Sequence, residues 1–145
     1  MEIEQLKQLM EDFVPFNKYL GIKVVKIEKG RAHLTLPFRS EFVGDPLRPA
    51  LHGGVVSTMA DVAGGMAAWT GVLDHRARVS TIDLRVDYLR PARLLTLDAD
   101  ALVVRQGNRV AVVDVKIFHP DHHGEVVATG KGVYNITLVK EKEKH

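Results

Sequence analysis

The feature that most constrains this chain is one long helical segment, at about residues 55–73, set among sequence that alternates like β-strands. Apolar residues recur along this segment at helical spacing, so one face of the helix must be buried. The larger members of this stripe are Val55, Met59, Val62, Met66 and Trp69. A chain with one long helix and several strands buries such a stripe against a sheet, which predicts a helix packed on a sheet.

The face opposite the stripe carries one carboxylate, Asp61, because each helical residue advances by about 100°. The neighbours of Asp61 on that face are all small: Gly54, Ser57, Thr58, Gly64, Gly65 and Ala68. Glycine inside a helix costs about 1 kcal/mol relative to alanine, so the Gly64-Gly65 pair indicates close approach by a ligand or another backbone. We therefore predict that Asp61 faces a tight site.

The helix is preceded by His52, Gly53 and Gly54, which extend this candidate site. The glycines lack a Cβ, so their N–H groups can come close to a ligand at the positive end of the helix dipole. Such donors suit a developing oxyanion. Asp61 lies about two turns further along, so we expect the donors and the carboxylate to meet in a cleft shared between two chains. The alternative interpretation is a glycine loop followed by a helix with a solvated Asp61.

Composition restricts the class of protein. With 145 residues and 46% hydrophobic content, residues 1–145 are expected to form one globular domain that ends in a frayed, charged tail at 139–145. The net charge of +2 has interleaved signs, which argues against nucleic acid as a partner, and no apolar run reaches transmembrane length. The lack of cysteine excludes disulfides and thiolate chemistry. The acidic N-terminus has no signal-peptide pattern, so we expect a cytoplasmic protein without membrane contact.

Alternating sequence on both sides of the helix predicts strands. The predicted strands are 22–28, 32–37, 78–89, 94–105, 109–119 and 125–138. A short amphipathic helix is predicted at 3–13, ended near Pro15, and a loop is predicted at 42–50 over the start of the long helix. Short turns between the later strands indicate antiparallel pairing. The fold class is therefore predicted as α+β, an antiparallel sheet wrapped around one central helix.

Two further groups of residues bear on the fold and on metal binding. In the strand 78–89 an apolar side, expected to face the helix, alternates with a polar side that includes Thr81; the apolar side is Ile82, Leu84, Val86 and Tyr88. The densest group of potential metal ligands lies near a predicted turn and consists of His119, Asp121, His122 and His123. Without cysteine or a second ligand cluster, this group is interpreted as a polar turn, and no metal is predicted.

Taken together, these features resemble the hotdog-fold acyl-CoA thioesterases, in the branch typified by the phenylacetate-pathway thioesterase. The resemblance covers nearly all of the chain. It is carried by His52-Gly53-Gly54, by Asp61 at its helical spacing, by residues 79–92 with their ending Tyr88-Leu89-Arg90-Pro91-Ala92, and by Gly107 with Arg109 following. It implies a hotdog fold with a five- to six-stranded antiparallel sheet, one long central helix and a short N-terminal helix. It also implies that two protomers pair their sheets edge to edge and share the active site.

The resemblance further implies roles for individual residues. The Gly53 amide would polarise the thioester carbonyl, and Asp61 of the partner chain would act as general base on water or as nucleophile. His52 would shape the loop and contact substrate. The family often has an asparagine before the HGG motif, where this chain has Asp45, and a serine in the following strand, for which the nearest match is Thr81.

The substrate implied by the resemblance is an acyl-CoA, whose phosphates call for basic partners. The candidates are Arg90, Arg109 and Lys131, and Gly54 and Asp45 complete the predicted substrate-binding set. Coenzyme A is part of the substrate, so no cofactor is predicted. The expected activity is hydrolysis of acyl-CoA thioesters by a homodimer that pairs again into a homotetramer. The alternative is a non-catalytic protein that binds acyl-CoA or an aromatic ligand. A hydratase on the same fold is a third interpretation, but its paired acid and histidine are not recognisable here.

Overall fold

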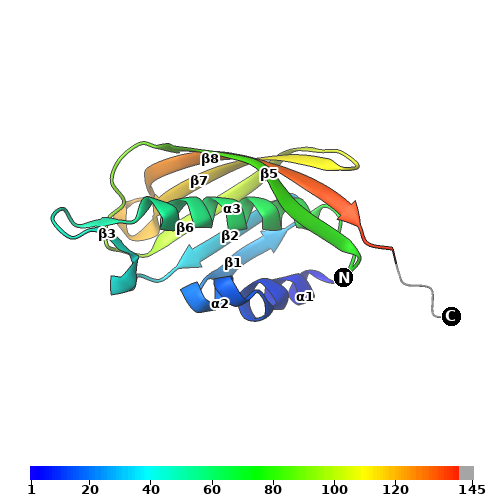
Figure 1. Cartoon of the computed structure of the whole chain (residues 1–145), viewed down its shortest axis with the longest axis horizontal. Helices are drawn as coiled ribbons and strands as arrows, with labels where there is room; N and C mark the ends of the chain where they lie inside the picture. Colours follow the sequence, from blue (N-terminus) through cyan, green and yellow to red (C-terminus); the bar gives the residue numbers. More distant parts are fainter. Residues whose placement is uncertain (141–145) are drawn as a thin grey trace.

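The computed structural model describes residues 1–140, in which a curved antiparallel sheet wraps around one long helix (Figure 1). The helices are α1 (Ile3–Gln8), α2 (Pro15–Leu20) and α3 (Gly53–Thr70), with a π-helical turn at Leu9–Phe13 and single 3-10 turns at Ser40–Phe42 and Pro120–His122. The strands are β1 (Lys23–Glu28), β2 (Arg31–Leu36), β3 (Val43–Asp45), β4 (Ala50–Leu51), β5 (Ala77–Tyr88), β6 (Leu97–Gln106), β7 (Val110–His119) and β8 (Glu125–Leu138).

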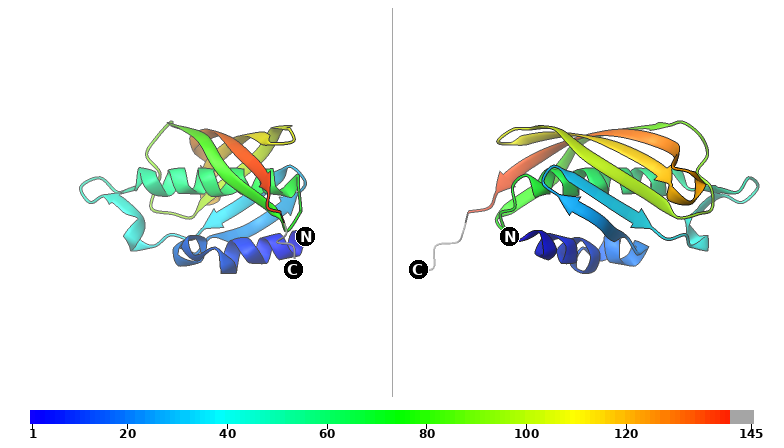
Figure 2. Two further views of the ribbon diagram at one scale, coloured as in Figure 1. Left: turned by 45° about the vertical axis from the view of Figure 1, so that its right-hand side comes forward. Right: turned by 180° about the vertical axis from the view of Figure 1, so that it is seen from behind.

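Six of these strands form the main sheet, in the order β1-β2-β6-β7-β8-β5, and every neighbouring pair is antiparallel. Strands β1 and β5 are the two edges. The sheet curves over α3, while α1 and α2 lie beside β1 (Figures 1 and 2). The predicted α+β class is confirmed. The segment predicted as a loop at 42–50 instead contains the small β3–β4 hairpin, which leads into the start of α3.

The buried face of α3 differs in part from the predicted stripe. Its fully buried residues are Met59, Ala60, Ala63, Met66, Ala67 and Ala68. Val55, Val62 and Trp69 were predicted to share this face but are only half-buried. Because the sheet curves around the helix, burial extends from the methionines to the alanine side. There the small methyl groups allow the helix to lie close to the strands.

A β-bulge in β5 changes which of its residues face α3. The pairing of β5 with β8 shifts register between Thr81 and Asp83, which leaves Ile82 unpaired and 57% exposed. Simple alternation predicted Ile82 facing the helix and Thr81 facing away, and both placements are wrong. An extra residue inverts the alternation, so Thr81 faces the helix before the bulge and Leu84 packs on the core after it.

Helical structure does not end at Pro15. Proline fixes the backbone angle that suits a first helical position, so Pro15 begins α2. In the π-helical turn before it, the Met10 carbonyl accepts a hydrogen bond from the buried Asn17 side chain at 3.1 Å. The Glu11 carboxylate accepts one from the Val24 N–H of β1 at 2.8 Å. These bonds fix the N-terminal helices against the edge of the sheet.

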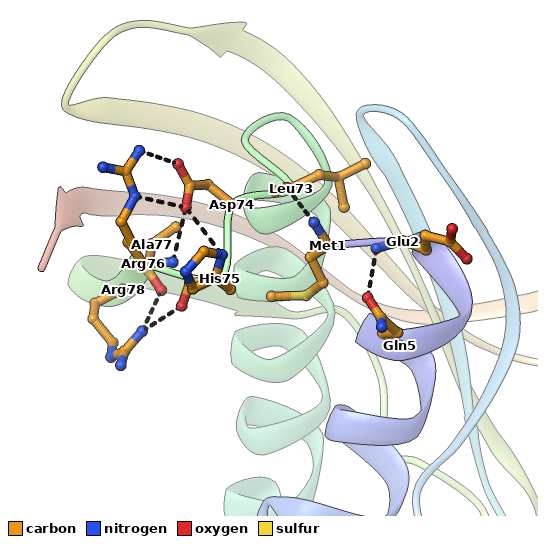
Figure 3. A network of polar contacts seen from close by, with 9 residues as sticks. All are labelled: Met1, Glu2, Gln5, Leu73, Asp74, His75, Arg76, Ala77 and Arg78. Atoms are coloured by element: carbon orange, nitrogen blue, oxygen red, sulfur yellow. Dashed lines mark hydrogen bonds and ion pairs between the residues drawn. The ribbon is translucent and has the colours of Figure 1, made fainter. Parts of the chain in front are cut away.

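The connection between α3 and β5 is held by a polar network (Figure 3). The Met1 ammonium group donates to the Leu73 carbonyl at 3.0 Å. The Asp74 carboxylate accepts hydrogen bonds from the Arg76 backbone and guanidinium, each at 2.8 Å, and these bonds hold the pKa of Asp74 well below its usual range. The Arg78 guanidinium donates to the His75 carbonyl at 3.1 Å. The network therefore fixes the junction between the helix that carries Asp61 and the strand that carries Thr81.

Within the predicted tail at 139–145, Val139 donates a backbone hydrogen bond to the Arg76 carbonyl at 2.9 Å. Residues 141–145 of that predicted tail lie outside the described residues. Within residues 1–140, no helix is long and apolar enough to cross a membrane.

Candidate active site

Asp61 is half-buried in the middle of α3, and its two carboxylate oxygens have different surroundings. Oδ1 accepts a hydrogen bond from the Thr81 hydroxyl at 2.7 Å and lies 3.3 Å from the Tyr134 hydroxyl. Oδ2 receives no hydrogen bond from residues 1–140. The carboxylate is therefore held through one oxygen, and the other remains open to a water molecule or a substrate.

Thr81 reaches Asp61 because of the bulge in β5. Thr81 is the direct pairing partner of Tyr134 on β8, and both side chains point toward α3. The predicted grouping of Asp61 with Thr81 is thus present in the structure. The Thr81 hydroxyl proton, however, is directed to the carboxylate.

Tyr134 was not identified from the sequence. Its side chain is 1% exposed, and its hydroxyl donates to the Asp61 backbone carbonyl at 3.0 Å. Burial raises the pKa of the Tyr134 phenol well above its usual range, and the neighbouring Asp61 charge adds to this. The hydroxyl therefore stays protonated and acts as a donor. The sequence signal that could have revealed it is the set of glycines, because a Cβ at Gly64 or at Gly132 would overlap the Tyr134 side chain.

Asp61 lines a cavity of about 260 Å³ between α3, β5 and the N-terminal helices. Its polar lining residues are Asn17, Asp61, Thr81 and Tyr134. The rest of the lining is Met10, Val14, Val62, Gly65, Met66, Trp69 and Val79. An apolar cavity with a few convergent polar groups is the usual form of a small-molecule site. The cavity can therefore hold an uncharged, apolar group next to the Asp61 carboxylate.

The HGG motif forms the start of α3. His52 is the N-cap, and its Nδ1 accepts a hydrogen bond from the Gly54 N–H at 2.8 Å. Gly54 was predicted to bind substrate, but this bond occupies its amide within the chain. A Cβ at Gly54 would lie 2.9 Å from this Nδ1, which explains the glycine. The Gly53 N–H is the first of the helix, is exposed, and has no acceptor among residues 1–140. Of the two glycines of the motif, Gly53 is therefore the one whose amide is free to bind a substrate.

Gly53 faces a different cavity from Asp61. A cavity of about 370 Å³ is lined by Gly53 and by residues at the end of β5, which include Tyr88 and Arg90. The Tyr88 hydroxyl contacts the Ser57 hydroxyl and donates to the Gly53 carbonyl at 3.0 Å, which fixes the loop. Eight residues of helix, about 12 Å, separate Gly53 from Asp61. Within one chain the two groups cannot act on the same atom.

The other predicted substrate-binding residues do not all gather at these cavities. Arg90 lines the cavity of Gly53. Asp45 instead folds back on its own hairpin and accepts the Leu47 and Arg48 N–H groups at 2.9 and 3.2 Å. These bonds lower the pKa of Asp45, the Leu47 bond contributing most. The Asp45 carboxylate is therefore occupied in a turn, not directed at the HGG loop.

The two remaining basic candidates lie elsewhere. Lys131 is in the middle of β8 rather than at a strand end, and its ammonium pairs with Asp114 at 3.0 Å. Arg109 lies in the β6–β7 turn, and neither residue lines the cavities of Asp61 or Gly53. The contacts of these two residues with a substrate therefore stay a prediction for a site shared between two chains.

In the predicted polar turn around residues 119–123, one histidine has a structural role. His119 is fully buried, and its Nε2 accepts the Arg93 N–H at 2.8 Å while Nδ1 lies 3.0 Å from the Thr96 carbonyl. His119 thus holds the β5–β6 connection through Arg93 and Thr96, whereas Asp121 is exposed. No group of three or more histidine and acidic side chains able to hold a metal ion occurs in the described part of the chain.

An antiparallel sheet around one helix, with an acid on that helix and a free glycine amide at its start, defines the hotdog class of thioesterase folds. Comparison with known proteins agrees, since residues 49–126 match the thioesterase superfamily. The chain is 36% identical over 133 residues to the medium/long-chain acyl-CoA thioesterase YigI of Salmonella typhimurium, over 81% of this chain and 86% of that protein. The chain belongs to the thioesterase superfamily.

Solved structures show the same fold. A thioesterase family protein from Silicibacter pomeroyi is 26% identical, with a TM-score of 0.83 over 93% of this chain and 98% of that chain. The PaaI protein of Escherichia coli, from the phenylacetic acid degradation operon, has a TM-score of 0.81 over 94% of this chain and 96% of that one. Its identity is 24%, so this second likeness concerns the fold alone.

Proposed function

We propose that this protein hydrolyses acyl-CoA thioesters to a free acid and coenzyme A, with Asp61 as the reacting carboxylate. The observation that carries the proposal is the asymmetric setting of Asp61. One oxygen is held by donors, and the other receives no hydrogen bond from residues 1–140, in a residue that lines a largely apolar cavity. The name of the Salmonella relative, a medium/long-chain acyl-CoA thioesterase, supports the same substrate class.

In the proposed reaction the open oxygen of Asp61 takes a proton from water while the water oxygen attacks the thioester carbonyl carbon. The tetrahedral intermediate then expels the coenzyme A sulfur, which receives a proton. In the second form of the reaction, which the same geometry allows, Asp61 itself attacks the carbonyl carbon and the C–S bond breaks, releasing the coenzyme A thiolate, which is protonated by solvent. Water then hydrolyses the resulting anhydride, which restores the Asp61 carboxylate and releases the acid. Water enriched in ¹⁸O distinguishes the two forms, because only the second places label in the Asp61 carboxylate during a single turnover.

The developing negative charge on the carbonyl oxygen needs a donor, and we assign this role to the Gly53 amide of a second copy. Gly53 and Asp61 face separate cavities within one chain, which supports a site completed between two copies. The free edge of β5 is next to Asp61 and offers unpaired backbone groups for edge-to-edge pairing. The proposed assembly is a homodimer, paired again into a homotetramer, and the proposed location is the cytoplasm.

Substrate recognition is assigned to the two cavities. The acyl group enters the cavity of Asp61, whose lining is largely apolar, and Arg90 beside Gly53 meets a phosphate of coenzyme A. His52 holds the Gly54 amide and thereby shapes the loop that presents Gly53. Asp61, Thr81 and the Gly53 amide are side-chain and backbone groups of the chain, so the proposed chemistry needs no cofactor.

The second candidate function is non-catalytic binding of acyl-CoA or of an aromatic ligand. It would use the same apolar cavity without turnover. Release of free thiol from a panel of acyl-CoA substrates separates the two functions. For the catalytic function we expect that Asp61→Asn keeps the fold but lowers kcat by about 10²–10⁴-fold, because the amide cannot accept the proton. A variant that keeps more than half of the wild-type kcat would exclude Asp61 from the chemistry.

A further inference from the structure

The buried tyrosine Tyr134 fits closely against the middle of α3. Its ring lies between α3 and the sheet, and a Cβ at Gly64 on the helix or at Gly132 on β8 would overlap it. A glycine inside a helix or a strand lowers the free energy of unfolding, so Gly64 and Gly132 each destabilise the fold. Filling the core does not by itself require this loss of stability. A smaller side chain at 134 would have removed the need for both glycines.

The hydroxyl of Tyr134 contacts the one turn of α3 that carries the carboxylate. Its single proton is shared between two acceptors of Asp61, the backbone carbonyl at 3.0 Å and Oδ1 at 3.3 Å. The phenol therefore ties both the backbone and the side chain of Asp61 to β8.

We propose that Tyr134 is a positioning residue for Asp61, which acts with Thr81 to hold Oδ1 and so leaves Oδ2 as the reacting oxygen. This inference rests on the proposed function, because it needs Asp61 to be the reacting carboxylate. Thr81 and Tyr134 are pairing partners on β5 and β8, so the sheet delivers both donors to the same oxygen. A carboxylate held in this way does not have to be reoriented when water or substrate arrives.

The phenol is suited to this role and not to proton transfer. It is 1% exposed and stays protonated, so it donates at any working pH. Asp61 and Tyr134 are the titratable groups that line the cavity within the described residues. A donated hydrogen bond favours the charged form of a carboxylate, so the phenol is a suitable partner for Oδ1.

The test is Tyr134→Phe, which removes the hydroxyl and keeps the ring. We expect kcat to fall by about 10- to 100-fold, less than for Asp61→Asn, because Thr81 still binds Oδ1. We expect KM to change by less than about threefold, since the hydroxyl does not contact the substrate. The acid limb of the kcat/KM profile should move to higher pH.

The matched control is Thr70→Val on the same helix. The buried Thr70 hydroxyl donates to the Ala67 carbonyl at 2.6 Å and accepts the Gly30 N–H at 2.7 Å, so its loss removes comparable buried hydrogen bonds far from Asp61. This variant should lose stability and keep kcat and the pH profile. If Tyr134→Phe changes activity no more than Thr70→Val does, the positioning role is overturned.

Two further variants complete the test. In the Asp61→Asn background, Tyr134→Phe should lower kcat no further, because the two residues act through one carboxylate. A normal Tyr134→Phe enzyme beside an inactive Asp61→Asn enzyme overturns this inference alone, whereas an active Asp61→Asn enzyme overturns the proposed function as well. If Tyr134→Phe does not fold, 3-fluorotyrosine at position 134 keeps the hydroxyl as a stronger donor. It should move the acid limb to lower pH, and an unchanged profile would contradict the proposal.

Discussion

The adjacent glycines of α3 provide a direct test of the packing around Asp61, because alanine should have opposite effects at the two positions. At Gly64 a Cβ would overlap the Tyr134 hydroxyl, and the ring is 1% exposed and already in close contact with Gly132. At Gly65 the nearest side-chain atom, Tyr134 Cε1, would lie 3.4 Å from the new Cβ, which is ordinary contact. The two substitutions are otherwise chemically identical.

The expected changes in the free energy of unfolding follow from three contributions. Alanine in place of glycine stabilises a helix by about 1 kcal/mol, and Gly65→Ala should keep about 0.5–1 kcal/mol of this. Gly64→Ala adds overpacking of about 1–3 kcal/mol and weakens a buried hydrogen bond that contributes about 0.5–1.5 kcal/mol. The net effect of Gly64→Ala is a destabilisation of about 0.5–3.5 kcal/mol. At about 4 °C per kcal/mol for a chain of this size, the two variants should differ in Tm by at least about 4 °C.

The assay is thermal unfolding followed by circular dichroism, at one protein concentration for all variants because assembly shifts Tm. Gly65→Ala should melt at or above the wild-type temperature, and Gly64→Ala should melt below it. A Gly64→Ala variant as stable as Gly65→Ala would refute the account of Tyr134 packing. A strong loss of stability at Gly65→Ala would instead indicate that this glycine serves a contact with a second copy.

Three other predictions test the substrate handle, the assembly and the acid stability. In steady-state kinetics, Arg90→Ala should raise KM for acyl-CoA several-fold with kcat little changed, because the phosphates are bound equally in the ground state and the transition state. An equal rise in KM for a thioester without the nucleotide would assign coenzyme A recognition to other residues. Ile82→Lys, at the exposed bulge of edge strand β5, should give monomers in sedimentation and lower activity, whereas an active monomer would contradict the shared site. Asp74→Asn should lower Tm at pH 7, because the hydrogen bonds from Arg76 lower the pKa of folded Asp74. The stabilisation is fully present above the unfolded pKa of about 3.9 and is lost as the pH falls from there towards the lower folded pKa, so the Tm difference should shrink below about pH 3.9. A Tm difference that grows on acidification would contradict this sign.

The regular elements were predictable because their patterns are local. The strand expected at 125–138 is β8 with the same bounds, Glu125–Leu138, and the expected helix at 55–73 corresponds to α3, Gly53–Thr70. Errors arose where one residue changes the pattern. The bulge at Ile82 reverses which residues of β5 face the helix, and the alternation of apolar and polar residues in that strand does not predict it. Pro15 was expected to end a helix and instead begins one.

The candidate site was predictable only in part. Asp61 and Thr81 were chosen from sequence, and the structure brings their side chains within 2.7 Å. Gly54 and Asp45 were chosen as well, but each is occupied by a local hydrogen bond, to His52 and to the Leu47 N–H respectively. Such local competition depends on backbone geometry, which the residue types alone do not specify.

The sequence by itself determined the six strands of the main sheet, the single long helix and the position of its one carboxylate, because hydrophobic periodicity and turn residues act over a few neighbours. Only the tertiary structure decided the environment of that carboxylate. Tyr134 is 73 residues from Asp61 along the chain, and its hydroxyl reaches the helix because β8 pairs with the bulged β5 and because Gly64 leaves room for it. A contact of this kind depends on sheet register and on close packing between distant segments, and no local pattern encodes either.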